Sequence, residues 1–123
     1  MTLIIAKGAS GAEYQLGAHP IGTKLTNLPG VYIFCHQDRN GDWIAHYVGQ
    51  AGGAQGLDNR VGSCVGNHEK LAAARRRGAT HIAAGTVDGG DAAICRIEND
   101  LIQGLNPPLN QKAPPGFGLR GLG

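Results

Sequence analysis

Residues 30–49 read GVYIFCHQDRNGDWIAHYVG, and this stretch decides the expected fold. After the opening glycine, the first residues are β-branched or aromatic, which favours a half-buried strand. Asn40-Gly41 in the middle is a strong signal for a tight hairpin turn, because both residue types tolerate a positive φ. Residues 43–49 then predict the return strand. We therefore expect an antiparallel pair in which the first Gly-Val-Tyr and the last Tyr-Val-Gly lie side by side.

Two tyrosines, Tyr32 and Tyr47, would hold their hydroxyl groups on this small sheet. Judged from the residues alone, a tyrosine pair on a hairpin is more often packing than chemistry. Whether the pair belongs to a functional site therefore depends on the residues that follow it.

The composition indicates one globular domain. A chain of 123 residues with 41% hydrophobic residues can bury a real core but has no room for a second domain. Its 21 glycines and 6 prolines indicate many turns and loops. The net charge of +2 is too mild to indicate a nucleic-acid binder by itself, although residues 70–81 form a local basic cluster.

Three scattered cysteines, at positions 35, 64 and 95, show neither zinc-binding spacing nor a disulfide framework. Reduced thiols are typical of cytosolic proteins, so a cytoplasmic location is expected. The apolar run at residues 3–6 is too short for a signal-peptide core, and no segment has the length of a membrane span. We expect no membrane partner.

Three regions follow from the turn and strand signals. Residues 1–29 predict an N-terminal extension, in which residues 3–5 and 13–16 can form a β-hairpin that adds strands to the sheet. Residues 30–110 hold the main domain. Residues 111–123 are a tail rich in glycine and proline that we expect to be loosely held.

Two helices are expected after the hairpin. The first runs from Leu57 to about residue 64 or 65, with Arg60 at the edge of its apolar face. An arginine there can pair with a carboxylate or bind a phosphate, because an isolated buried charge is costly. The second spans residues 68–77, with Asn67 as N-cap and Gly78 past its end. Its last turn holds three arginines that suit either the helix dipole or phosphate contact, namely Arg75, Arg76 and Arg77.

A third strand at residues 80–87 and a final helix at residues 91–104 complete the expected elements, with Asp91 as the cap of that helix. The helix has an apolar arc of roughly 140°. Glu98 falls inside this arc, so its carboxylate must find a cation, a metal or a dense set of hydrogen bonds, or else be protonated. A metal site and a structural ion pair with Arg60 are about equally supported by the pattern.

Taken in order, these motifs resemble the GIY-YIG endonuclease family. The resemblance spans about residues 30–110 and rests on an ordered set of weak motifs, namely Gly30-Val31-Tyr32, Tyr47-Val48-Gly49, Arg60 with Val61, Glu98, and Pro108-Leu109-Asn110. It implies an α+β fold with a small three-stranded mixed or antiparallel sheet flanked by helices. It also implies cleavage of nucleic-acid phosphodiester bonds, most readily those of DNA, with Mg²⁺ or Mn²⁺ as cofactor.

The resemblance assigns a role to each matching residue. Glu98 resembles the sole acidic metal ligand, Arg60 the arginine that contacts phosphate, and Asn110 the asparagine that closes the site. Tyr32 and Tyr47 resemble the paired tyrosines, and Tyr32 is expected to touch the attacking water. A single glutamate can suffice for Mg²⁺, because this ion keeps several waters and takes one or two carboxylates.

The chain departs from the family pattern at two places. Cys64 stands where members often have His or Tyr, so His68 is the alternative to Tyr32 as general base, although a first-turn histidine is more often a surface residue. Gln50 follows the second motif, where lysine is common. Further nucleic-acid contacts are expected from Gly49, Gln50, Lys70 and the three arginines.

Two other functions stay open on the sequence. One is a nucleic-acid-binding domain of the same fold that does not cleave, and the other is a structural or interaction domain in which Glu98 and Arg60 merely satisfy the core. No recognition helix is free to enter the major groove, so we expect weak sequence preference. Selectivity would then come from nucleic-acid shape, a partner protein or a symmetric homodimer.

Overall fold

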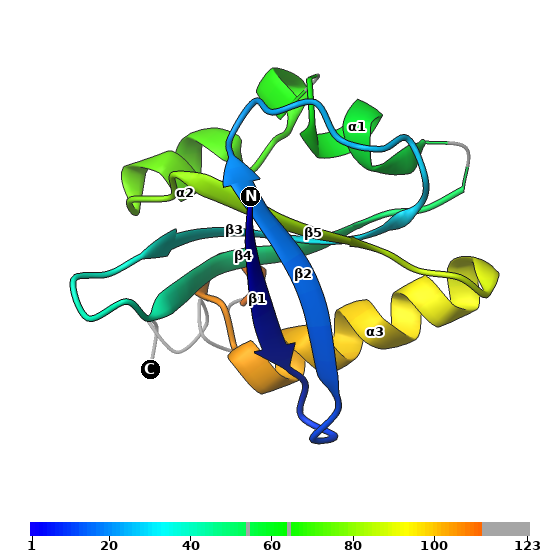
Figure 1. The fold of residues 1–123 in the computed structure, drawn as a ribbon. Helices are drawn as coiled ribbons and strands as arrows, with labels where there is room; N and C mark the ends of the chain where they lie inside the picture. The colour runs from blue at the N-terminus through cyan, green and yellow to red at the C-terminus, as the bar shows by residue number, and fades with distance from the viewer. Residues whose placement is uncertain (54, 64, 112–123) are drawn as a thin grey trace, which may run out of the picture.

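The computed structural model describes residues 1–53, 55–63 and 65–111, which form an α+β fold. Helices α1 (Gly56–Val61) and α2 (Leu71–Arg76) lie over one face of a sheet, and α3 (Gly90–Leu105) crosses the other (Figure 1). The five strands are β1 (Thr2–Lys7), β2 (Glu13–Pro20), β3 (Gly30–Gln37), β4 (Trp43–Ala51) and β5 (His81–Thr86). Two short 3₁₀ turns are η1 (Val65–Asn67) and η2 (Pro108–Asn110).

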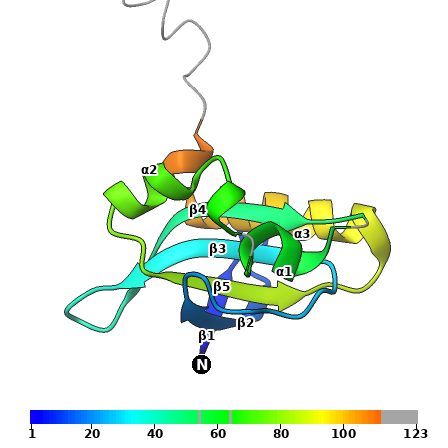
Figure 2. The same ribbon diagram turned by 90° about the horizontal axis from the view of Figure 1, so that it is seen from above.

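The sheet is fully antiparallel and has five strands in the order β1-β2-β5-β3-β4. The three-stranded sheet that the resemblance implies is therefore wrong, whereas the predicted addition of strands by the N-terminal hairpin is confirmed. The N-terminal hairpin supplies the other two, because β2 pairs with the free side of β5 from Gly17 opposite Ala84 to Pro20 opposite His81. Without β2, that side of β5 would expose unpaired backbone groups. The view from above shows β4 along one border of the sheet (Figure 2).

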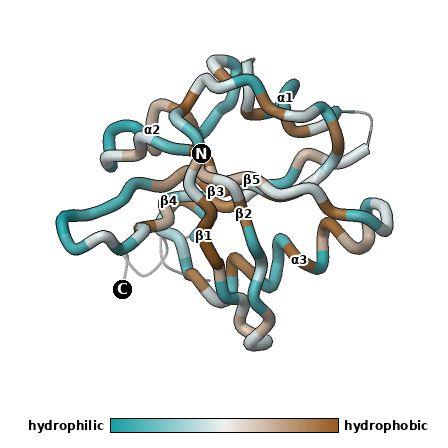
Figure 3. Tube along the Cα trace, in the orientation of Figure 1, coloured by the Kyte–Doolittle hydropathy of each residue, from teal (hydrophilic) through white to brown (hydrophobic). Residues whose placement is uncertain are grey.

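The expected hairpin of β3 and β4 is present, and its turn uses Gly41 at φ 86°. Tyr32 lies opposite Gly49, and Phe34 lies opposite Tyr47. The residues of the turn form a hydrophilic tip beyond the sheet (Figure 3). The two glycine-tyrosine motifs are therefore brought together by strand pairing.

A β-bulge interrupts this pairing, because Phe34 pairs with Tyr47 whereas Cys35 pairs with Ala45. His46 is the extra residue, and its ring stacks on that of His36 with centroids 4.9 Å apart. A bulge changes the alternation of side chains along the strand. Consequently Ala45 contacts the core beneath α3, whereas Tyr47 contacts the core beneath α1 and α2.

Each face of the sheet has its own buried core. The α3-side core consists of Ala6, Leu16, Ala18, Val31, Ile33, Cys35, Val48, Ala83, Ile94 and Leu101. The α1–α2-side core consists of Tyr32, Phe34, Ala51, Leu57, Val61, Val65, Leu71, Ala74, Ala79 and Ile82. The second core differs in containing a buried tyrosine whose hydroxyl needs a polar partner.

Helix α1 is shorter than expected and ends at Val61. Asp58 accounts for this end, because its carboxylate accepts hydrogen bonds from the backbone N–H groups of Ser63 and Leu25 at 3.1 and 2.8 Å. A Cβ on Gly62 would lie 2.2 Å from the same carboxylate, so the chain turns away at a glycine. The helical pattern of residues 57–65 is thereby divided between α1 and η1.

Helix α2 begins at Leu71 rather than at His68, and Asn67 is not its N-cap. His68 instead forms a turn in which its Nδ1 atom accepts a hydrogen bond from the Lys70 N–H at 3.0 Å. Gly78 follows the last helical turn at φ 104°, in the left-handed conformation expected for a residue past a helix end.

Helix α3 matches its expected position, but Asp91 does not cap it. Gly89 stands at the N-cap in a left-handed conformation, and Asp91 accepts a hydrogen bond from Gly53 N–H at 2.9 Å. This contact ties the loop after β4 to the start of α3. None of the helices within the described ranges is long and apolar enough to cross a membrane.

Candidate functional site

Tyr32 and His68 form the centre of the candidate site, within the α1–α2-side core. The Tyr32 hydroxyl lies 2.5 Å from His68 Nε2, and the two residues are 1% and 5% exposed. The His68 ring also contacts Phe34 and Tyr47, with centroids 5.0 and 5.6 Å away. His68 is therefore not the surface residue that its expected place in a helix suggested.

The hydrogen bonds of His68 determine which ring nitrogen carries the proton. Nδ1 accepts the Lys70 N–H, so it is unprotonated. Burial, followed by the charge of Arg60, lowers the pKa of His68 to about 4, which leaves a neutral ring with its proton on Nε2. Nε2–H therefore donates to the Tyr32 oxygen. His68 positions this tyrosine, and its own protonated nitrogen is not available to accept a proton.

Tyr32 and Gly49 are coupled by close contact across the hairpin. A Cβ on Gly49 would lie 2.4 Å from both Cζ and the hydroxyl oxygen of Tyr32. Gly49 thus makes room for the ring of the opposite tyrosine. Burial raises the pKa of Tyr32, so its hydroxyl is protonated at neutral pH.

Tyr47 lies beside this pair and is more exposed than Tyr32. Its ring centroid is 6.3 Å from that of Tyr32. Burial raises the pKa of Tyr47 first, and the negative charges of Glu69 and Glu98 raise it further. Of the two tyrosines, Tyr47 is the one whose side chain is only partly buried.

Arg60 pairs with Glu69 and not with Glu98, so the structural ion pair considered between Arg60 and Glu98 is wrong. Its Nη2 atom donates to both carboxylate oxygens of Glu69, at 2.9 and 3.2 Å. This hydrogen bonding lowers the pKa of Glu69 to about 2. The contact joins the end of α1 to the turn before α2, and the sequence pattern did not single out Glu69.

Glu98 is half-buried on α3, as the helical periodicity predicted, and burial raises its pKa. Within the described part of the chain, it makes no ion pair. Its carboxylate acts electrostatically on Tyr47 of the border strand β4, although α3 packs on the opposite face of the sheet. No hydrogen bond or ion pair among the described residues joins Glu98 to Tyr32, Tyr47, Arg60 or His68.

Asn110 holds the outer side of β4. Its Oδ1 atom accepts the Val48 N–H at 2.7 Å, and its Nδ2 atom donates to the Val48 carbonyl oxygen at 2.8 Å. Both functional groups of the amide are used by the backbone. The structure thus gives Asn110 a clear positioning role next to Tyr47.

The residues expected to contact nucleic acid lie at two places. Gln50 is turned toward α3, where its amide approaches Cys95 Sγ at 3.7 Å. The basic residues Lys70, Arg75, Arg76 and Arg77 lie on α2 and its ends, with the three arginines exposed. Cys64, the departure from the family pattern, lies outside the described residues, as do residues 112–123 of the expected tail.

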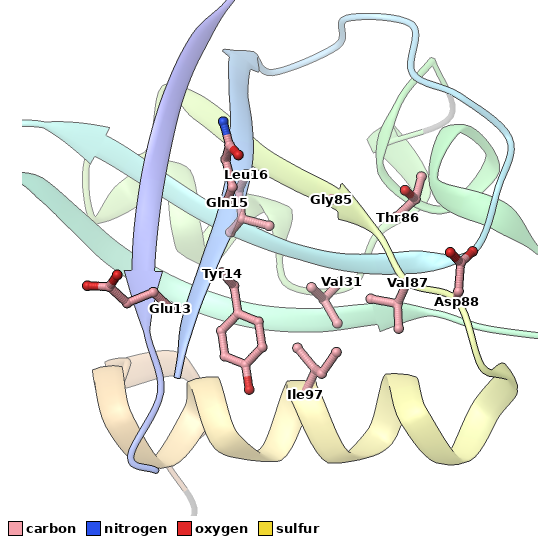
Figure 4. A pocket seen from close by; sticks show the side chains of 10 residues that line it. All are labelled: Glu13, Tyr14, Gln15, Leu16, Val31, Gly85, Thr86, Val87, Asp88 and Ile97. Carbon is pink, nitrogen blue, oxygen red and sulfur yellow. The ribbon is translucent and has the colours of Figure 1, made fainter. Parts of the chain in front are cut away.

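A pocket of about 310 Å³ lies away from this site, between α3 and strands β2, β3 and β5 (Figure 4). It is lined in part by Tyr14, Val31, Val87 and Ile97. Tyr14 donates its hydroxyl to Asp100 on α3 at 2.7 Å. The pocket therefore follows the seam where the N-terminal hairpin meets α3, and it contains none of the expected site residues.

Across residues 1–53, 55–63 and 65–111, no three or more His, Cys, Asp or Glu side chains cluster as a metal site would require. Comparison of the chain with models of protein families, with curated proteins and with solved structures gives no match. Functional inference therefore depends on the site itself.

Proposed function

We propose that this chain is a divalent-metal-dependent nuclease of the GIY-YIG type that hydrolyses phosphodiester bonds, with DNA as its substrate. The observation that carries the proposal is the convergence of Tyr32, His68 and Tyr47 beside Arg60. This group of side chains places hydroxyl groups beside a guanidinium, and a guanidinium matches phosphate oxygens in geometry and charge.

Glu98 is the residue that would bind the divalent cation that this activity requires. Among residues 1–53, 55–63 and 65–111, no cation pairs with the half-buried carboxylate of Glu98, whose pKa burial raises, and a divalent cation would provide the missing charge. Its oxygen atoms are the ligands that Mg²⁺ and Mn²⁺ prefer, and Mg²⁺ can be held by a single carboxylate with waters and substrate oxygens. When bound, such an ion supplies Lewis acidity and lowers the pKa of water.

The protein's own residues would then have distinct tasks. Arg60 binds the scissile phosphate, because a guanidinium matches phosphate oxygens in geometry and charge. Tyr47, which is partly exposed, replaces Tyr32 as the tyrosine that we place at the attacking water. Tyr32 is almost fully buried, and His68 fixes its hydroxyl. Asn110 keeps β4, and with it Tyr47, in place.

Plasmid cleavage tests the proposal. The purified protein is incubated with Mg²⁺ or Mn²⁺ and with supercoiled, linear, single-stranded or branched DNA. Glu98→Gln should abolish cleavage while the melting temperature is retained, and Arg60→Ala should lower turnover by roughly 10²–10³-fold. Glu13→Gln, which changes an exposed carboxylate on β2, is the matched control. An active, folded Glu98→Gln protein would exclude the metal role of Glu98.

A nucleic-acid-binding domain without cleavage is the second candidate. The burial of Tyr32 and His68 and the pairing of Arg60 with Glu69 favour it, because these groups are less free to take part in chemistry. The same assay separates the two functions. Binding of labelled DNA that is unaffected by the divalent ion, without any cleavage of the four substrates, would support the second candidate over the first.

A further inference from the structure

Glu69 occupies the guanidinium of Arg60 in the way that an anionic ligand would. Both carboxylate oxygens lie within hydrogen-bond distance of Arg60 Nη2, at 2.9 and 3.2 Å. A phosphate group offers the same arrangement, namely two oxygens that share a negative charge. The shape and charge of the contact therefore mark an anion site on Arg60.

The pair is poorly protected from exchange with such a ligand. The side chain of Glu69 is 60% exposed, whereas that of Arg60 is 24% exposed. Exposed ion pairs contribute little to stability, since water and salt compete for both partners. Glu69 can therefore swing into solvent at small cost, while Arg60 stays anchored at the end of α1.

Among the residues that the structure describes, the other polar groups beside Arg60 carry no negative charge. His68 is neutral, because burial and the charge of Arg60 lower its pKa. The Tyr32 hydroxyl keeps its proton, because burial raises its pKa. When Glu69 leaves, the charge of Arg60 is available to an incoming anion.

We propose that the Glu69 carboxylate occupies the phosphate-binding position on Arg60 in the free protein. The phosphate group of a ligand displaces this carboxylate. The identification of that ligand as nucleic acid rests on the function proposed above. In this role Glu69 competes with the ligand for Arg60, so an anion with low affinity for Arg60 does not displace it.

Binding of inorganic phosphate tests the displacement directly. Phosphate is titrated at constant ionic strength into the wild-type protein, Glu69→Gln and Glu13→Gln, and the Arg60 side-chain NMR signal is followed. Glu69→Gln should bind phosphate about two- to fivefold more tightly than the wild type, which corresponds to the loss of one competing exposed pair. Glu13→Gln removes the same charge at a distant place and should bind as the wild type does.

The Arg60→Ala background supplies the decisive comparison. If Glu69 acts only through Arg60, adding Glu69→Gln to Arg60→Ala should give no gain in phosphate protection against thermal unfolding. Unchanged or weaker phosphate binding by a folded Glu69→Gln protein would overturn the proposal, as would a gain that persists without Arg60. The weaker binding would mean that Glu69 holds Arg60 in its binding position.

A labelled DNA duplex and a labelled RNA duplex distinguish this proposal from the broader one. Tighter phosphate binding by Glu69→Gln without any nucleic-acid binding would remove the nuclease assignment and leave the anion site intact. Nucleic-acid cleavage combined with no change in phosphate binding would support the nuclease and remove the proposed role of Glu69. Each result therefore bears on one proposal separately.

Discussion

On the α3 face of the sheet, Tyr14 donates to Asp100, whereas on the opposite face Tyr32 accepts from His68. The Asp100 carboxylate also accepts the backbone N–H and the hydroxyl of Ser10, at 2.9 and 2.7 Å. These contacts bind the N-terminal hairpin to α3 at a partly exposed seam. Tyr32 and His68, by contrast, lie inside a core and not at a partly exposed seam.

The difference shows that a tyrosine hydroxyl can be paired at a docking seam or inside a core, at different energetic cost. At the seam, docking of the hairpin on α3 gives each polar group its hydrogen-bond partner, so stability alone accounts for the arrangement. In the α1–α2-side core, apolar residues of similar size would fill the space without desolvating a hydroxyl and an imidazole. The function proposed above accounts for the presence of these polar groups in such a place.

The pH dependence of stability should separate the two faces most strongly. His68 has an ordinary pKa of 6.5 and a folded pKa of about 4, so the unfolded chain binds a proton more readily. The stability that this shift contributes is present above pH 6.5 and is lost as the pH falls toward 4, by at most about 3 kcal/mol. Urea unfolding of the wild type and His68→Gln across this range measures it.

His68→Gln should flatten the slope between these pH values, although buried His46, whose pKa is also lowered, keeps part of it. Glu69→Gln is unsuitable as a control, because the Glu69 carboxylate lies 3.9 Å from His68 Nδ1 and itself raises the pKa of His68. Glu13→Gln removes an exposed carboxylate on β2 away from His68 and should keep the wild-type slope. An unchanged slope in His68→Gln would contradict the neutral state of His68.

A methyl group at Gly49 should have the next largest effect. Gly49→Ala places a Cβ at 2.4 Å from the Tyr32 hydroxyl, so the ring must move, and overpacking of this kind costs about 1–3 kcal/mol. Gly66→Ala is the matched control, because nothing lies within 4 Å of its added Cβ. Thermal melts compare the two variants. Equal melting temperatures would show that Tyr32 does not lie over Gly49.

Removing each tyrosine hydroxyl gives a smaller but more direct comparison. Tyr32→Phe leaves the buried Nε2–H of His68 without its acceptor, which should cost about 1–2 kcal/mol. Tyr14→Phe leaves Asp100 with its two bonds to Ser10 and should cost about 0.5–1 kcal/mol. Denaturant unfolding of both variants measures the difference. A larger loss for Tyr14→Phe would reverse our assessment of the two faces.

The sequence predicted the parts of the fold that depend on local pattern. The Asn40-Gly41 turn and the β-branched residues around it were sufficient for the β3–β4 hairpin. The apolar arc of α3 was sufficient to place Glu98 half inside. The sheet order was not predictable in this way, because pairing of β2 with β5 depends on a contact between segments far apart in the chain.

The candidate site was predicted less completely, because its contacts cross helix ends that the pattern misplaced. The expected helix at residues 68–77 put His68 on a first turn, whereas its own Nδ1 organises the turn that precedes α2. Glu69 is paired with Arg60 only because of that turn. The adjacency of His68 and Glu69 after a helix break is the one signal that could have indicated the pair.

The Asn110 amide has a consequence for how any partner can approach the site. Its two bonds to Val48 imitate the peptide group of a sixth strand, so at this position the border of the sheet is already satisfied. An extended peptide that paired its main chain with Val48 would first have to displace the Asn110 amide. A partner that contacts the sheet at Val48 must therefore use groups other than a paired main chain.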